Sequence, residues 1–171
     1  CGAITCSNVQ FNDAILLGAN LVLGAANSST FFSTIDSGPG GPFDLTINSI
    51  STTLTGAIGG TSALGTLVTD ATGTTYLTGN VTATTVSFRD AVQLNADITV
   101  NASSQADFLQ TVNSASGQAY DLTVNSLVGT FHAAGVSFAY KWLKPGPRWL
   151  AQRLDHRCAV SEDARRLAAS S

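Results

Sequence analysis

An internal repeat constrains the fold of this chain more than any other feature. Residues 1–49 align without a gap with residues 78–126, at an offset of 77 positions, and 18 of the 49 aligned pairs are identical. Self-similarity at a fixed period is typical of architectures in which one structural unit is stacked or strung along the chain. The repeat therefore restricts the fold class before any local motif is considered.

The conservative differences between the two copies indicate what the repeat preserves. Apolar, strand-favouring residues replace one another at seven aligned positions: Ile4/Val81, Ile15/Val92, Leu21/Ile98, Leu23/Val100, Ile35/Val112, Ile47/Val124 and Phe43/Tyr120. The polar positions between them vary more freely, as in Asn20/Asp97 and Val22/Thr99. This pattern indicates a buried face, and therefore a requirement of packing and not of a reaction.

Apolar residues alternate with small and polar ones throughout the repeat, which predicts short β-strands. The expected strands cover residues 4–11, 14–24, 31–35, 43–47, 53–57, 64–68 and 74–77. Asn12-Asp13 is expected to form a corner, and Gly- and Pro-rich segments at 37–42, 59–60 and 70–73 predict turns. The loop at 37–42 has no proline in its second copy, so we expect it to lie at the surface and to vary freely.

A shorter echo lies inside the repeat and distinguishes two architectures. Residues 54–58 recur at 77–81, an offset of 23 positions that suits one coil of a β-solenoid, so that 77 residues would span three to four coils. The alternative is a string of immunoglobulin-like β-sandwiches. Strands within one sandwich have no reason to echo one another, so the sequence favours an all-β, parallel β-helix.

The repeats are similar in style to those of large bacterial exoproteins. Residues 88–94, 120–126 and 77–82 resemble the β-strand repeats of filamentous-haemagglutinin-like adhesins and of autotransporter passenger domains. The resemblance covers about residues 1–134, and it implies a right-handed parallel β-helix that is exported to the bacterial cell surface for adhesion. The chain departs from the family in its cysteines and in its basic tail, and it contains neither a secretion domain nor a translocator barrel.

The charge distribution divides the chain in two. Residues 1–140 contain eight Asp, no Glu and a single basic residue, Arg89, so we expect no binding of nucleic acid. Repeat copy one covers residues 1–77, and a partial copy two covers 78–134. The basic segment 135–171 does not follow the repeat. It has three possible interpretations: an amphipathic helix that binds a membrane surface or an anion, a solvated linker, or the translation of a shifted reading frame.

The two ends of the repeat region carry further expectations. Residue 1 already lies inside a repeat, which suggests that the chain is a fragment or a processed piece of a longer protein. A solenoid cut within a repeat exposes unpaired strands, and this predicts end-to-end self-association. There is no run of about 18 apolar residues, so no membrane-spanning helix is expected.

The sequence predicts no catalytic, cofactor-binding or metal-binding residue. Asp13/Asp90 and Asp44/Asp121 recur in both copies, but positions three or four coils apart cannot act on one glycosidic bond, so we expect Asp residues at strand corners. His132 and His156 stand alone. A Cys1–Cys6 disulfide is conceivable, although a small residue buried in a strand is favoured, and Cys158 lies in the tail.

These observations lead to two functional hypotheses. The first is a non-catalytic rod segment of a secreted adhesin at the bacterial outer surface, which displays Thr-, Ser- and Asn-rich faces to host or matrix carbohydrate or protein. The second is a fragment of a carbohydrate-active β-helix enzyme, a polysaccharide lyase or glycosidase, whose site lies outside this chain. Cleavage of polysaccharides by the purified chain would distinguish the two.

Overall fold

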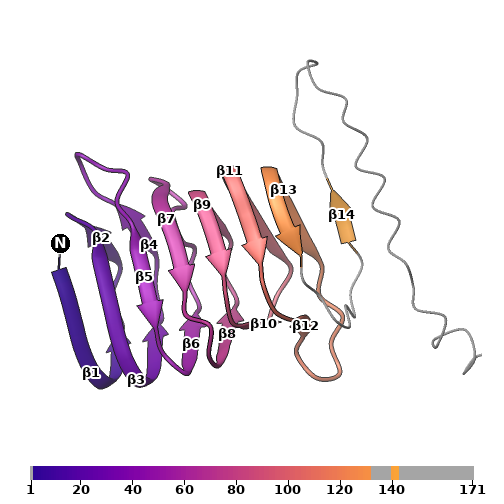
Figure 1. Ribbon diagram of the computed structural model, residues 1–171, viewed down its shortest axis with the longest axis horizontal. Helices are drawn as coiled ribbons and strands as arrows, with labels where there is room; N and C mark the ends of the chain where they lie inside the picture. The colour runs from indigo at the N-terminus through magenta and orange to yellow at the C-terminus, as the bar shows by residue number, and fades with distance from the viewer. Residues whose placement is uncertain (1, 132–139, 143–171) are drawn as a thin grey trace, which may run out of the picture.

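The structure is a computed structural model that describes residues 2–131 and 140–142 (Figure 1). The described residues form strands and turns and contain no helix, so none that could cross a membrane. The strands are β1 (Gly2–Phe11), β2 (Ile15–Leu17), β3 (Leu21–Phe31), β4 (Ile35–Ser37), β5 (Leu45–Asn48), β6 (Ser51–Leu54), β7 (Leu64–Thr69), β8 (Thr74–Leu77), β9 (Val81–Phe88), β10 (Ala91–Leu94), β11 (Ile98–Phe108), β12 (Val112–Ser114), β13 (Leu122–Phe131) and β14 (Tyr140–Trp142).

Every described strand pair is parallel, which makes the chain a β-solenoid of about six turns. Each strand pairs with the strand one coil later, at an offset of 17 to 24 residues. In Figure 1 the coils follow one another along the long axis of the molecule. The predicted parallel β-helix is thus confirmed. Tandem sandwiches are excluded because their strands would pair antiparallel; the right-handed winding stays a prediction.

The strand pairs define three faces that run along the solenoid. Face 1 carries β2, β4, the amino-terminal parts of β9, β11 and β13, and β14. Face 2 carries the amino-terminal parts of β1 and β3, then β5 and β7, and the carboxy-terminal parts of β9, β11 and β13. Face 3 carries the carboxy-terminal parts of β1 and β3, followed by β6, β8, β10 and β12.

The core is a set of apolar columns inside the coils. Successive side chains of a strand point to opposite sides, so every second residue faces inward. On face 3, Phe31, Leu54, Leu77 and Leu94 stack directly, and each is at most 1% exposed. Burial of apolar area at this scale supplies the main driving force for folding. Most apolar positions that both copies share face inward, as at Leu17/Leu94, Leu23/Val100 and Phe31/Phe108.

The 23-residue echo corresponds to one coil, as predicted. Leu54 pairs with Leu77, and Ile58 bridges to Val81. The echo also explains a repeated glycine, because Gly56 and Gly79 occupy the same corner in successive coils. A Cβ atom on Gly79 would overlap the backbone of Gly56, and one on Gly56 would overlap the backbone of Ser33. Only glycine permits the corners to stack this closely.

The 77-residue repeat spans three coils and two further faces. From Phe11 the register on face 3 passes through Phe31 and Leu54 to Leu77. The chain then crosses face 1 and reaches Phe88, the repeat equivalent of Phe11, on face 2. The predicted three to four coils are therefore confirmed. Equivalent residues of the two copies therefore lie on different faces of the solenoid: Phe11 is on face 3, whereas Phe88 is on face 2.

Three predicted strands have the wrong bounds. The strand expected at 14–24 is two strands, β2 and the start of β3, with a corner at residues 18–20 between them. Residues 31–35 contain a corner instead of a strand, because Phe31 ends β3 and Ile35 begins β4. Phe31 and Ile35 are both buried, on different faces, and they are four residues apart. In the sequence this spacing looks the same as the alternation of a single strand. Similarly, the strand expected at 53–57 lies at Ser51–Leu54, since residues 55–57 turn the corner at which Gly56 meets Ser33.

The surface loop between β4 and β5 keeps its geometry in the second copy. Gly40 and its equivalent Gly117 have φ values of 90° and 76°, in the left-handed region that favours glycine. The hydroxyl oxygen of Ser37 accepts the Phe43 N–H at 2.7 Å, and that of Ser114 accepts the Tyr120 N–H at 2.9 Å. The loop thus varies in sequence, as expected, while its turn is preserved.

Part of the predicted tail pairs with the solenoid. Residues 140–142, which form β14, continue face 1 beyond β13. The remainder of the tail, including its expected helix, lies outside the described residues. The boundary at residue 134 and the proposed origins of the tail stay predictions.

Candidate functional site

The most deeply buried charged group of the described residues is Asp90, at the corner between faces 2 and 3. Its side chain is only 1% exposed. The Thr69 hydroxyl donates to Oδ1 of Asp90 at 2.6 Å, and the Thr75 hydroxyl donates to Oδ2 at 2.7 Å. Both threonines belong to the preceding coil and are fully buried. Asp90 therefore connects two neighbouring coils inside the solenoid.

The environment of Asp90 changes its proton affinity. Burial raises the pKa of this carboxyl above its usual value, and the negative charge of Asp70 acts in the same direction. The hydrogen bonds from Thr69 and Thr75 oppose the rise, because they stabilise the ionised form. A raised carboxyl pKa can mark a catalytic acid. Here the carboxyl faces the interior and its oxygens are occupied, so the geometry favours a structural role.

A row of hydroxyl groups lies beside this corner. Ser29, Thr52 and Thr75 are buried at equivalent positions of three successive coils on face 3. The hydroxyl groups of Ser49 and Thr52 are 2.8 Å apart and hydrogen-bonded, whereas Ser29 Oγ is buried without a partner. The row fixes the register between coils, because a slip would leave hydroxyl groups against apolar neighbours.

The recurring aspartates lie at corners, as predicted, but they are not alike. Asp13 is exposed, whereas its equivalent Asp90 is buried. The N–H of Asp44 donates to the Asn20 side chain at 2.9 Å, and the N–H of Asp121 donates to the Asp97 side chain at the same distance. Members of each repeat pair are separated by three coils and two faces, so the structure brings neither pair together.

Other candidate groups are distributed as follows. Within residues 2–131 and 140–142, no cluster of three or more His, Cys, Asp and Glu side chains could hold a metal ion. The thiol of Cys6 is free and half-buried in β1, which confirms a strand position but not full burial. Cys6 therefore forms no disulfide in the described structure, and Cys1, Cys158, His132 and His156 lie outside the described residues.

The outer surface of face 3 is uncharged over its full described length. Its strands turn only amide, hydroxyl and small side chains outward, and these are half-buried or exposed: Asn8, Gln10, Ser28, Thr30, Ser51, Thr53, Thr74, Tyr76, Ala91, Gln93 and Asn113. Adjacent strands of a sheet lie about 4.8 Å apart, so this neutral face presents hydrogen-bonding groups at a regular spacing. Such a surface can bind an extended ligand through many similar contacts.

Exposed apolar side chains recur at two repeat-equivalent corner positions that the sequence analysis missed. Phe32 and Leu109 are 51% and 38% exposed, and Ile50 and Leu127 are 58% and 66% exposed. The sequence does contain a pattern that marks these positions: in both copies, each of these apolar residues directly follows a buried residue. Alternation alone could not separate these corner residues from core residues.

Comparisons of the chain with protein-family models, with curated proteins and with solved structures give no match.

Proposed function

We propose that this chain is a non-catalytic rod segment of a secreted bacterial surface adhesin. Its neutral face 3 would bind carbohydrate or protein on a host cell or in the surrounding matrix. The observation that carries the proposal is the uncharged, hydroxyl- and amide-bearing surface repeated over six successive strands of face 3. The resemblance of the repeats to filamentous-haemagglutinin-like exoproteins and autotransporter passenger domains supports the placement at the cell surface.

The proposed mechanism is multivalent display. Each outward hydroxyl or amide group forms a hydrogen bond of modest net strength, about 1 kcal/mol. A ligand that lies along the solenoid axis meets an equivalent group in every coil, and contacts made after the first are effectively intramolecular. The rigid stack keeps these groups in position, which reduces the entropy lost on binding.

Binding of the full chain to immobilised neutral polysaccharides and matrix proteins tests the proposal. Thr53→Glu with Gln93→Glu adds two charges to face 3 at half-buried outward positions, and we expect binding to be lost. The matched control, Thr46→Glu with Thr85→Glu, adds the same charge at half-buried positions of face 2 and should leave binding unchanged. Circular dichroism would confirm that both variants keep their strands.

Two outcomes would count against the adhesive role. If the chain binds nothing in the panel, or if the face 2 and face 3 variants lose binding equally, face 3 is not the binding surface. If the chain cleaves a polysaccharide, the alternative role in a carbohydrate-active enzyme gains support instead. Both measurements use the same purified chain.

A further inference from the structure

The outer surface of face 3 extends one residue beyond the ends of its strands. Thr30 and Phe32 both lie on the outer side, because side chains alternate and Phe31 between them is buried. The backbone pairing of face 3 also continues at this position, since the Phe32 N–H donates to the Phe11 carbonyl at 2.9 Å and the Thr55 N–H donates to the Phe31 carbonyl at the same distance. In later coils the position of Phe32 is taken by uncharged residues: Thr55, Thr78 and Asn95.

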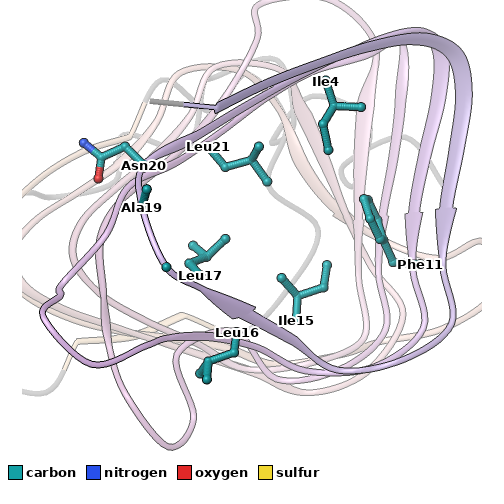
Figure 2. Close-up of a pocket in the computed structure, with 9 residues that line it drawn as sticks. Ile4, Phe11, Ile15, Leu16, Leu17, Ala19, Asn20 and Leu21 are labelled. Carbon is teal, nitrogen blue, oxygen red and sulfur yellow. The ribbon is translucent and has the colours of Figure 1, made fainter.

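Two aromatic rings lie on this outer surface, and neither packs into the core. Phe32 is 51% exposed, and Tyr76 is half-buried at an outward position of β8. Figure 2 shows the opposite arrangement for Phe11, whose ring points into the interior of the solenoid, where it stacks on Phe31. An exposed aromatic ring offers a flat apolar surface to a ligand. Phe32 and Tyr76 are therefore candidates for ligand contacts.

A column of unpaired hydroxyl groups runs over the same coils. Thr30 pairs in register with Thr53, and Thr53 with Tyr76, so their side chains lie side by side on β3, β6 and β8. Within the part of the chain that the structure describes, these three hydroxyl groups form no hydrogen bond with another residue. The amide of Gln93, beside Tyr76, instead donates to Asn95 at 3.0 Å. The unpaired hydroxyl groups can therefore exchange water for the hydroxyl groups of a ligand.

The charges around face 3 favour a neutral ligand. Asp70 lies at the corner with face 2, and the exposed Asp97 and Asp121 lie at the corner with face 1. Arg89 follows Asp70 one coil further along the same corner, so this flank carries no excess of positive charge. A polyanion on face 3 would meet negative charge on its flanks without gaining a row of cations. A neutral chain avoids this repulsion.

The dimensions of face 3 favour a single extended chain over a folded protein. Six neighbouring strands, each with about five residues on the face, cover about 29 Å by 16 Å, or roughly 450 Å². A stable protein–protein interface buries about 800 Å² on each partner. A polysaccharide needs only the width of one sugar ring. Neighbouring coils are also about 4.8 Å apart, which is close to the advance per sugar in an extended β-1,4-linked chain.

We propose that face 3 binds one extended, neutral β-1,4-linked hexose chain, with Phe32 and Tyr76 stacking on the C–H faces of two sugar rings. The two side chains lie two coils apart, about 10 Å along the axis, with Thr53 in the coil between them. Tyr76 is displaced across the face by two residues, so the bound chain runs obliquely to the axis. The inference rests on the proposed adhesive function and assigns its class of ligand.

Calorimetric titration of the full chain with hexasaccharides tests the class of ligand. We expect saturable binding of β-1,4-linked glucan or mannan hexasaccharide. The curved α-1,4-linked glucan hexasaccharide and the charged hexagalacturonate should not bind. If neither neutral β-1,4-linked hexasaccharide binds, or if hexagalacturonate binds as tightly, the proposal is wrong. If matrix proteins alone bind through face 3, the adhesive function stands and the assignment of a polysaccharide ligand is overturned.

Substitutions of the two rings test the stacking contacts. Phe32→Ala and Tyr76→Ala should each weaken binding of the hexasaccharide about fivefold to tenfold, because each removes one aromatic surface. Tyr76→Phe keeps the ring and should bind nearly as the native chain does. If the two alanine variants bind like the native chain, the rings do not contact the ligand.

Leu16→Ala is the matched control for these variants. Leu16 is 66% exposed on face 1, and Figure 2 shows its side chain pointing away from the interior. Its removal takes away exposed apolar surface without touching face 3, so binding should be unchanged. A loss in Leu16→Ala equal to that in Phe32→Ala would show that the effect is not specific to face 3 and would overturn the proposed contact. Circular dichroism of every variant checks that the strands are retained.

Discussion

The first strands of the two copies pair alike with the coil that follows them but have very different surroundings. Phe11 stacks on Phe31 with an interplanar angle of 15°, and Phe88 contacts Phe108 with a tilt of 35°; the ring centroids are 5.2 Å apart in each pair. Yet Phe11 is half-buried, whereas Phe88 is fully buried. Because the local sequence and the partner in the following coil agree, the difference arises from the preceding coil, which pairs with β9 through β7. In a solenoid, burial is therefore a property of neighbouring coils as much as of the residue itself.

The largest difference between the copies is expected for the phenylalanines Phe11 and Phe88. Phe88→Ala should reduce the free energy of unfolding by about 3–5 kcal/mol, because it opens a cavity in a closed core. Phe11→Ala should cost about 1–2 kcal/mol, since the native side chain is already partly exposed. Unfolding in urea, followed by circular dichroism, measures both values. Equal losses would mean that the end coil is as well packed as the interior.

Removal of the buried Asp90 should likewise reduce the free energy of unfolding more than removal of the exposed Asp13, although the difference should be smaller. Asp90→Ala leaves the buried hydroxyl groups of Thr69 and Thr75 without their acceptor, so we expect a loss of about 2 kcal/mol. Asp13→Ala changes an exposed corner and should stay within about 0.5 kcal/mol. The same urea experiment applies. A large effect of Asp13→Ala would reveal a contact that the first coil makes in solution.

The pH dependence sharpens the comparison for Asp90 alone. Burial raises the pKa of this carboxyl in the folded state above its ordinary value of 3.8. Between the two values the folded state holds the proton more firmly than the unfolded state, so the Asp90 contribution to stability falls as the pH rises through that interval. The stability of the native chain relative to Asp90→Asn should therefore decrease as the pH rises from 3.8 through the raised pKa of the folded state.

Asp13→Asn is the control for this titration. Asp13 is the exposed repeat equivalent of Asp90, so this variant removes one carboxyl without opening a buried site. Urea unfolding of the three chains across the pH series measures the effect. If the native chain instead became more stable relative to Asp90→Asn as the pH rises, the hydrogen bonds from Thr69 and Thr75 would lower the carboxyl pKa more than burial raises it.

The smallest expected difference concerns the conserved surface loop. Ser37 is 3% exposed and Ser114 is half-buried, although both accept the equivalent backbone N–H. Ser37→Ala should cost about 1 kcal/mol and Ser114→Ala about 0.5 kcal/mol, because water can replace the lost acceptor more readily in the exposed loop. Thermal unfolding of both variants checks the order. The reverse order would indicate that the second loop is the more tightly packed.

Much of the fold could be predicted from the sequence, because alternation and coil length act locally. The 23-residue echo predicted that Leu54 would lie beneath Leu77, and the structure confirms this pair. The corners were less predictable. Phe31 and Ile35 both point inward from different faces, so an alternating pattern continues across a turn and hides it.

The candidate site was less predictable than the fold. Asp13 and Asp90 follow the same phenylalanine and precede the same alanine, so no local signal distinguishes the exposed carboxyl from the buried one. The distinction depends on Thr69 and Thr75, which lie 21 and 15 residues before Asp90 and meet it only after one coil is wound. The prediction of no catalytic residue stays a prediction, as does the adhesive role.

The rotation between the copies has a consequence for any longer rod assembled from this unit. The repeat covers three full coils and two more faces, so equivalent residues of successive copies lie on different faces of the solenoid, as Phe11 does on face 3 and Phe88 on face 2. A given side chain would return to its original bearing only after three units. In such a rod each surface group would recur on all three faces. A binding partner could therefore reach it from any side without rotation of the rod.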